Sequence, residues 1–378
     1  MGTRDTDLVP DFRNYDHLRR RFPVVSKPKV LGAFSIDKNR EYHDDLENLK
    51  YLNVPGESGG IVHWDLNSGY ENYLPKKEKD NCNIDHILEF IVKNEKKIKN
   101  SGSSKKIIPD FVSFRGLLRL IMCTPYEARP RDEPWIVLAT KYRGTIYLCQ
   151  KETPEAEAAR RNMPEDQEKF CYYGFKFEQY ILTKEPNKSN DLSKPVIANE
   201  EFAVAFSSKF AGHNLLYVAE MDGIISDTAI EKKTDLSRIP VEFVEVKTKK
   251  REEHPQQLRN FKRFKLRKWW CQSFLAGIDS VFVGVRNNKG IVEKIERMRV
   301  GEMAEIGASD WSGSICMNFC IIFLDTVKAA MEDIDDPNTV IKFSFNPQFC
   351  NRILHEKFPG KSDLSFLPEW YIKFLECL

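Results

Sequence analysis

The sequence predicts an α+β protein in which mixed β-sheets are flanked by helices. After residue 170 the pattern becomes rich in apolar, strand-like segments, and one long helical segment lies among them. Strands and helices do not alternate in the regular order of a parallel βαβ fold, which favours mixed sheets. No linker-like stretch divides the chain. We therefore expect residues 1–378 to form a single domain, with its motif-bearing core at about 110–300.

The N-terminal part is expected to hold few regular elements. Before residue 80 the chain is polar and is predicted to be irregular, with a turn at the glycine-rich stretch 56–60. Helical spacing of apolar residues then predicts two helices, and two alternating segments around a turn predict a hairpin. Residues 151–168 are expected to be a loop or loosely helical. The predicted elements are a helix at Ile84–Lys99, a helix from Phe114, and hairpin strands Trp135–Tyr142 and Thr145–Gln150 around Arg143 and Gly144.

The C-terminal part is predicted to supply most of the strands. A proline at the first helical position marks the start of the long helix, and Asn287 to Gly290 form a turn signal between two strands. The predicted strands are Val204–Ser207, Leu215–Glu220, Val241–Lys247, Ser280–Arg286, Ile291–Val300 and Val340–Phe345. The predicted helices are Pro255–Ala276, a buried helix at 315–331, and Pro368–Leu375.

Composition excludes several classes of protein. Apolar residues make up 41% and charged residues 30% of the chain, which is typical of a soluble globular protein. No apolar run approaches the ~18–20 residues of a membrane span. Nine scattered cysteines without a CxxC pair argue against disulfides and zinc and favour a reducing, intracellular compartment. The net charge of +2 means that any nucleic-acid surface must be local, as at Lys247–Arg251 or Arg259–Lys268, although such runs also occur on solvated faces.

The first acidic motif is Glu220-Met221-Asp222, at the end of an apolar strand. On a strand, residues i and i+2 point to the same face, so the two carboxylates are expected to lie together. Their repulsion needs a neutralising group, and a divalent cation is suited to oxygen ligands. Taken alone, the motif is better explained as a strand end that enters an acidic turn.

The second motif is Glu245-Val246-Lys247, on another predicted strand. Glu245 and Lys247 project from the same face. The acid can hold a metal ion, while the ammonium group orients an attacking water or offsets negative charge on a phosphate. The plainer interpretation is an exposed salt-bridge partner, because Glu-Val-Lys is a common tripeptide.

The third feature is a polar stripe on the long helix. Lys268 and Gln272 are four residues apart and share a face, which Phe261 and Lys265 extend. Such a stripe presents polar groups into a site or simply edges a core. Three aromatic residues of this helix are expected to pack in the core rather than to stack on nucleobases: Trp269, Trp270 and Phe274.

The order of these motifs resembles the PD-(D/E)XK nuclease core, which holds one or two Mg²⁺ ions against a phosphodiester. Further segments resemble the DXO family of RNA decapping and 5′-end exonuclease proteins. They cover roughly residues 110–290 in the family's order, and the N-terminal hundred residues match only faintly. The matching segments are Phe114–Gly116, Cys123–Glu127, Tyr173–Tyr180, Glu220–Gly223, Glu245–Lys247 and Lys265–Phe274.

The resemblance implies a role for each matching residue. Lys247 and Gln272 would contact the scissile phosphate or the attacking water. Arg115 would pair with substrate phosphate, for which a guanidinium fork is suited, and Lys268 would also bind substrate. The ligands of two expected Mg²⁺ or Mn²⁺ ions would be Glu178, Glu220, Asp222, Glu245 and the backbone carbonyl of Val246.

The resemblance also implies a function: metal-dependent hydrolysis at the 5′ end of single-stranded RNA. The leaving group would be pyrophosphate, an incomplete cap or an NAD cap, with 5′–3′ exoribonuclease activity as a further possibility. We expect no membrane association and favour the nucleus, with the cytoplasm open. Two alternatives stay open: a non-catalytic partner of a larger nuclear 5′–3′ exoribonuclease, and a DNA nuclease of the wider PD-(D/E)XK group.

Overall fold

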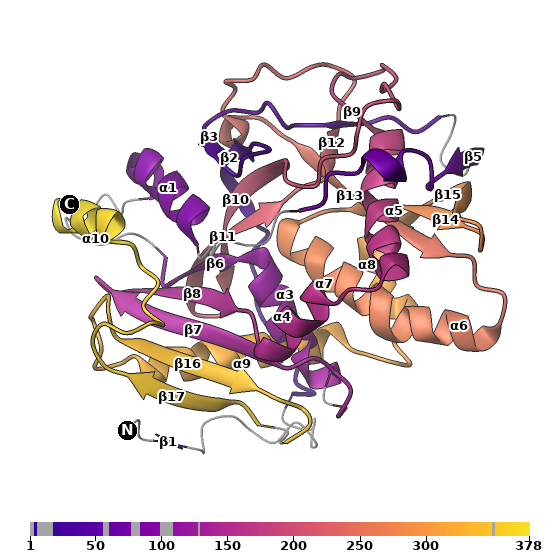
Figure 1. The fold of residues 1–378 in the computed structure, drawn as a ribbon. Coiled ribbons are helices and arrows are strands. Elements are labelled where there is room, and N and C mark those ends of the chain that lie inside the picture. The colour runs from indigo at the N-terminus through magenta and orange to yellow at the C-terminus, as the bar shows by residue number, and fades with distance from the viewer. Residues whose placement is uncertain are drawn as a thin grey trace.

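Two β-sheets and the helices around them make up the computed structural model, which describes residues 4–5, 18–55, 60–76, 84–98, 109–127, 129–349 and 352–378. The large sheet has ten strands and the small sheet seven, and both mix parallel with antiparallel neighbours. Figure 1 shows the large sheet from the lower left to the centre and the small sheet at the right. The predicted α+β class with mixed sheets is confirmed.

The large sheet contains the predicted hairpin and the strand that leads to the acidic motif. Its strands, in spatial order, are β1 (Arg4–Asp5), β17 (Leu354–Phe358), β16 (Val340–Phe345), β7 (Trp135–Tyr142), β8 (Thr145–Lys151), β6 (Phe111–Phe114), β11 (His213–Glu220), β10 (Glu201–Phe210), β2 (Lys29–Ile36) and β3 (Tyr42–His43). The small sheet carries the second motif. Its strands are β5 (Ile61–Asp65), β15 (Ile291–Arg299), β14 (Ser280–Arg286), β13 (Glu242–Lys250), β12 (Gly223–Ile225), β4 (Tyr51–Leu52) and β9 (Leu182–Thr183).

Helices cover both faces of each sheet and so define three buried clusters. The largest cluster combines one face of each sheet with α3 (Arg115–Cys123), α7 (Arg267–Ala276) and α9 (Gly313–Ala330). The other face of the large sheet packs under α1 (Asp85–Lys93) and α10 (Glu369–Glu376), and the other face of the small sheet packs under α5 (Glu165–Ile181). The remaining helices are α2 (Glu95–Ile98), α4 (Pro154–Arg161), α6 (Pro255–Asn260) and α8 (Val300–Ile306).

The helix α9 is the predicted buried helix. It is long and apolar enough to cross a membrane by length and composition alone, but 56% of it is buried inside the protein. Its side chains pack between the two sheets with α3, which also contacts α7. We therefore assign it to the core.

Two expectations about local structure were wrong. The region before residue 80 is not irregular, because β2 is an eight-residue strand that pairs with β10 along its length. Residues 171–181, in the part that was expected to be strand-rich, belong to the helix α5, whose buried residues recur at helical spacing against β13. The helix predicted at Pro255–Ala276 is confirmed with these bounds, and its middle is a π-helical stretch, η5 (Phe261–Leu266), between α6 and α7. The predicted turn at 56–60 lies almost wholly outside the described residues.

Candidate metal centre

The acid centre, defined as Glu178, Glu220, Asp222 and Glu245, lies where the chain passes from the large sheet to the small one. β11 ends at Glu220 and β12 begins at Gly223. Met221 between them is buried, whereas Glu220 is exposed and Asp222 is half-buried. Both carboxylates line the same pocket. The crossing between the sheets therefore brings two acids to one cleft.

Strand β13 contributes the third acid and the lysine. Glu245 is only 1% exposed, and its Oε1 accepts hydrogen bonds from the ammonium of Lys247 and from Nε2 of Gln272, the latter at 2.6 Å. The backbone N–H of Val246 donates to Oδ2 of Asp222 at 2.7 Å. Since the N–H and C=O of one strand residue point to the same edge, the carbonyl of Val246 also points toward Asp222.

Helix α5 contributes the fourth acid from another direction. Glu178 lies one turn before the end of α5, is half-buried, and has its Oε2 3.7 Å from Nζ of Lys50. The charges of Lys247 and Glu245 act on its pKa, as does that of Lys50, so the carboxylate lies in the field of the β13 motif. The structure thus brings all four predicted acidic residues to one region from three elements and the segment that links the sheets.

The environment of the centre opposes negative charge on three of its acids. Removal from bulk water raises the pKa of Glu178, Glu220 and Asp222, and it raises that of Glu220 to about 7. Neighbouring acids add to the effect, since the charge of Glu201 acts on Glu220 and that of Glu245 acts on Asp222. Three neighbouring carboxylates whose pKa stays raised in spite of nearby lysines are the situation that a bound cation relieves.

Glu245 differs from the other three acids because its counter-charges outweigh the effect of burial on its pKa. Burial opposes its ionisation, but Lys247 and Arg115 together lower its pKa. Burial likewise opposes the charge of Lys247, yet the carboxylates of Glu245 and Asp222 raise its pKa. Glu245 and Lys247 are therefore an ion pair at neutral pH, close enough to Glu178 and Asp222 for its charges to act on them.

Arg115, at the start of α3, forms contacts that join several elements of the site. Its Nη1 donates to the carbonyl of Gln272 at 3.1 Å and its Nη2 to the carbonyl of Glu220 at 2.8 Å. Its Nη1 also lies 3.6 Å from Oε2 of Glu245. The side chain is buried, so this geometry ties α7 and β11 to β13. The structure gives Arg115 a positioning task in addition to the phosphate contact that the sequence predicts.

The donor set fits a hard divalent cation. It offers carboxylate oxygens and one carbonyl, and the buried Oε2 of Glu245 has no hydrogen-bond partner within the described part of the chain. The carboxylates are, however, spread across the cleft. Among the described residues, three potential ligand atoms lie within 4.8 Å of one another only at the turn of Asp37, Glu41 and His43. Ligation of one ion by three acids of the centre therefore requires small side-chain rotations.

Lys268 lies at the rim of the cleft and not at its floor. Its side chain is 44% exposed, and its Nζ is 2.9 Å from Oε1 of Glu127. The same oxygen accepts from Nη2 of the buried Arg267. Glu127 thus fixes Lys268 on the helix that carries Gln272. Trp269 and Trp270 are buried, and Phe274 stacks on Trp270, as predicted for core residues.

Several residues near the centre were missed by the sequence analysis. Glu201 is paired with Arg40 at 2.7 Å and with Lys76, and Lys50 is paired with Glu178. All but Glu201 come from the N-terminal region that was expected to be irregular. No local motif marks them, because the pairing of β2 with β10 and of β4 with β12 brings them here.

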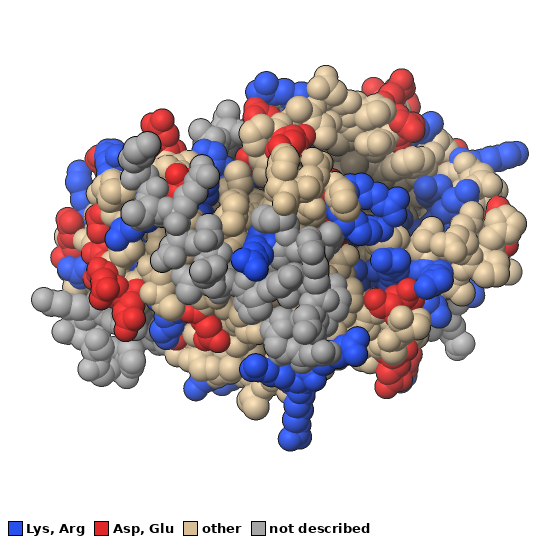
Figure 2. Space-filling view, turned by 90° about the horizontal axis from the view of Figure 1, so that it is seen from below, with Lys and Arg blue, Asp and Glu red and all other residues tan. Residues whose placement is uncertain are grey.

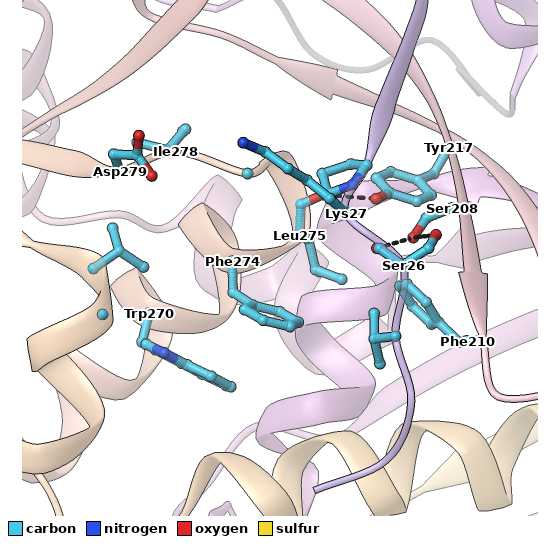
Figure 3. A pocket seen from close by; sticks show the side chains of 15 residues that line it. Ser26, Lys27, Ser208, Phe210, Tyr217, Trp270, Phe274, Leu275, Ile278 and Asp279 are labelled. Carbon is cyan, nitrogen blue, oxygen red and sulfur yellow. Dashed lines mark hydrogen bonds between the residues drawn. The ribbon is translucent and has the colours of Figure 1, made fainter.

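A larger cavity lies on the opposite side of α7 and is separate from the acid centre. Figure 3 shows Trp270 and Phe274 on one side of it and Ser26, Ser208 and Tyr217 on the other. The hydroxyl of Tyr217 donates to the carbonyl of Leu275 at 2.7 Å. None of the four acids lines this cavity, so the larger hollow does not mark the chemical site.

Comparison with protein families gives a match over most of the chain. The sequence model of the RAI1-like PD-(D/E)XK nuclease family matches residues 26–372. The decapping and exoribonuclease protein of Homo sapiens is 34% identical over 357 residues, which cover 93% of this chain and 86% of the human protein. The Rai1 decapping and exoribonuclease protein of Drosophila melanogaster is 33% identical and covers 94% of this chain and 93% of its own length.

Solved structures share the fold. Candida albicans Rai1 in complex with pU5 and Mn²⁺ has a TM-score of 0.79 at 19% identity, covering 100% of this chain and 99% of its own. Scheffersomyces stipitis Rai1 in complex with (3′-NADP)⁺ and calcium has a TM-score of 0.76 at 20% identity, and the match covers 94% of this chain and 98% of that protein. At these identities the likeness concerns the fold alone.

Proposed function

The chain belongs to the RAI1-like PD-(D/E)XK nuclease family, and from this premise we propose that it is a divalent-metal-dependent hydrolase of RNA 5′ ends. The observation that carries the proposal is the acid centre. Three further carboxylates, those of Glu178, Glu220 and Asp222, lie near the Glu245–Lys247 pair and have a raised pKa. The names of the human and fly relatives, which describe decapping and exoribonuclease proteins, support the same substrate class.

The residues divide into ligands and supporting groups. Glu178, Glu220, Asp222, Glu245 and the carbonyl of Val246 would hold Mg²⁺ or Mn²⁺, with two ions proposed. Such ions, when bound, supply an activated water and neutralise charge that develops on a phosphate. Glu178, Glu220 and Asp222 line one pocket, and Val246 is hydrogen-bonded to Asp222.

The other residues act on the substrate or on the ligands. Lys247 is held by Glu245, and its charge acts on Glu178 and Asp222, so its ammonium can donate to a phosphate oxygen at the acid centre. Gln272 keeps the carboxylate of Glu245 in orientation through its 2.6 Å hydrogen bond. Arg115 fixes the position of Gln272 relative to Glu245, and the partly exposed Lys268 would contact the substrate outside the acid centre.

The substrates proposed are RNAs with a 5′ triphosphate, an incomplete cap, an NAD cap or a 5′ monophosphate. Each places a phosphoester where the same ions and the same lysine act. The structures of relatives with pU5 and with (3′-NADP)⁺ support both a strand and a dinucleotide-like group as ligands. The released product, which is pyrophosphate, the cap or a mononucleotide, identifies which of these RNAs is hydrolysed.

The test uses the purified chain on these four RNAs and on single-stranded DNA, with Mn²⁺, with Mg²⁺ and with EDTA, and resolves products by mass. We expect metal-dependent product from at least one RNA, and its loss in Glu220→Gln/Asp222→Asn. Glu369→Gln, an exposed glutamate of α10, is the matched control and should behave as wild type. Turnover of DNA in preference to RNA, or RNA binding without turnover under any metal, would overturn the proposal.

A further inference from the structure

Strand β13 has an open edge beside the acid centre. β12 pairs with β13 only as far as Val244, opposite Gly223, and no described strand lies on that side from Glu245 to Lys250. The N–H of Val246 points to this edge, since it donates to Asp222. Alternate residues of a strand point to the same edge, so the N–H groups of Thr248 and Lys250 also point there. The edge therefore offers backbone donors that continue away from the acid centre.

Three cations without ion pairs lie near the C-terminal end of β13, one on β13 itself and the others on the neighbouring segments β14 and η5. Lys250 is exposed and lies opposite Arg286 of β14, and Lys265 is exposed on η5. Burial and the charge of Arg286 lower the pKa of Lys265, and burial lowers that of Arg286. No carboxylate of the described residues lies within 4.0 Å of any of the three, whereas Lys249 and Arg251 each pair with a glutamate at 3.1 Å.

Unpaired cations close to one another favour a polyanion beside them. Figure 2 shows lysine and arginine side chains around a hollow at the right of the face drawn there. The pocket at Glu178, Glu220 and Asp222 suits a polyanion less well. It contains none of the residues from 245 to 250, and its six acidic residues outnumber its two lysines, Lys50 and Lys184. Charge thus directs a nucleic-acid strand along the open edge of β13.

We propose that this edge, with Lys250, Lys265 and Arg286, holds the sugar-phosphate backbone of the RNA strand whose end lies at the acid centre. The proposal rests on the proposed function. From Glu245 to Lys250 the edge extends about 17 Å, at ~3.4 Å per residue, which is long enough for more than one nucleotide. Phe170, 51% exposed and 5.1 Å from the guanidinium of Arg286, adds a surface on which a base can stack.

Binding of the RNA backbone along this edge predicts that affinity depends on strand length and on salt concentration. Each phosphate contact in a single-stranded complex adds about 0.7 to the slope of log affinity against log salt. The variant Lys250→Ala/Lys265→Ala removes two side-chain contacts and should reduce that slope by about 1.4. A dinucleotide bound at the acid centre does not reach these lysines and should bind as before.

The experiment measures binding of a 5′-phosphorylated RNA of about 20 nucleotides by fluorescence anisotropy across a salt series. Ca²⁺ replaces the activating ion, a gel confirms that the RNA stays intact, and the dinucleotide pUpU is measured by competition. We expect the double variant to bind the long RNA about tenfold more weakly than wild type and with the smaller salt slope. Its affinity for pUpU should stay within about twofold of the wild-type value. Lys361→Ala, an exposed lysine beside α10, is the control and should match wild type.

Two outcomes overturn the proposal. An unchanged salt slope would show that the lysines make no phosphate contact, and an equal loss of pUpU would place their effect at the acid centre. An unchanged melting temperature of the double variant separates either result from misfolding. Failure of the proposed function is a different result, because wild type would then release no product from any RNA with Mn²⁺.

Discussion

Replacement of Arg115 by lysine separates two roles for this residue, since lysine keeps the charge but loses the guanidinium fork. The structure shows the fork donating to the carbonyls of Gln272 and Glu220, beside the buried carboxylate of Glu245. A lysine cannot make both bonds, and a hydrogen bond from a charged group contributes about 1.5–3 kcal/mol. We expect Arg115→Lys to lose that much free energy of unfolding. Arg115→Ala should lose about 3–5 kcal/mol, because the buried Glu245 also loses a counter-charge.

Two measurements distinguish this positioning role of Arg115 from a simple contact with substrate phosphate. Urea unfolding at neutral pH in EDTA gives the free energy of unfolding, and calorimetry gives the affinity for Mn²⁺, which should fall about 10–100-fold when supporting groups shift the ligands. Arg238→Lys, at an arginine whose side chain is 81% exposed, is the matched control. If Arg115→Lys kept wild-type stability and Mn²⁺ affinity while its KM for RNA rose, Arg115 would act only on substrate and the argument from its hydrogen bonds would fail.

Further predictions follow from the acid centre and from the packing around it. Because the folded state raises the pKa of Glu220 from 4.5 to about 7, the cost of ionising it is absent below about pH 4, grows between these two pKa values and is complete above pH 7. In EDTA, Glu220→Gln should therefore melt higher than wild type at pH 8, with a much smaller difference at pH 5, and Mn²⁺ should reverse the difference at pH 8. A melting-temperature difference independent of pH would contradict this. Gly284→Ala should cost about 1–3 kcal/mol of unfolding free energy, because its Cβ would lie 2.5 Å from the ring of Phe177 on α5. Gly174 lies on α5, where an added Cβ would have no atom within 4 Å, so Gly174→Ala should instead stabilise the protein by about 0.5–1 kcal/mol. Urea unfolding checks both glycine variants. Gln272→Met should lower turnover about 10–100-fold with little change in RNA affinity, since it removes only the donor to Glu245; an equal loss of affinity would assign Gln272 to substrate binding.

The parts of the fold that the sequence predicted well depend on local signals. The hairpin at Trp135–Tyr142 and the strand at Ser280–Arg286 have the predicted bounds, because apolar strands next to turn residues form with little dependence on distant contacts. The Asn287–Gly290 turn is of the same kind, with Gly290 at a φ of 84° that favours glycine. For the site, the alternation of Glu220 and Asp222 around the buried Met221 follows from strand geometry alone.

The parts that it predicted poorly depend on distant partners. β2 carries Gly32, an unfavourable residue inside a strand, but a Cβ there would lie 3.0 Å from the ring of Phe90, so the close packing of α1 requires it. The helix α5 is rich in Phe and Tyr, which favour strands locally, and its burial against β13 overrides that preference. The neighbours of the acid centre that were missed, such as Lys50, reach it only through such long-range pairing.

The geometry of the acid centre depends on how the two sheets pack, because its carboxylates do not belong to one sheet. Glu220 ends a strand of the large sheet, whereas Glu245 lies on the small sheet, two residues from Phe243. The ring of Phe243 packs edge-on against Phe206 of β10, with ring centroids 5.9 Å apart, and Phe206 in turn stacks on Tyr217 of β11. These three rings link the two strands that carry the acids, and a well-packed core transmits a change of even one methylene. The aromatic contact between the sheets therefore controls the spacing of the proposed metal ligands, although none of its three rings lines the pocket at Glu220 and Asp222.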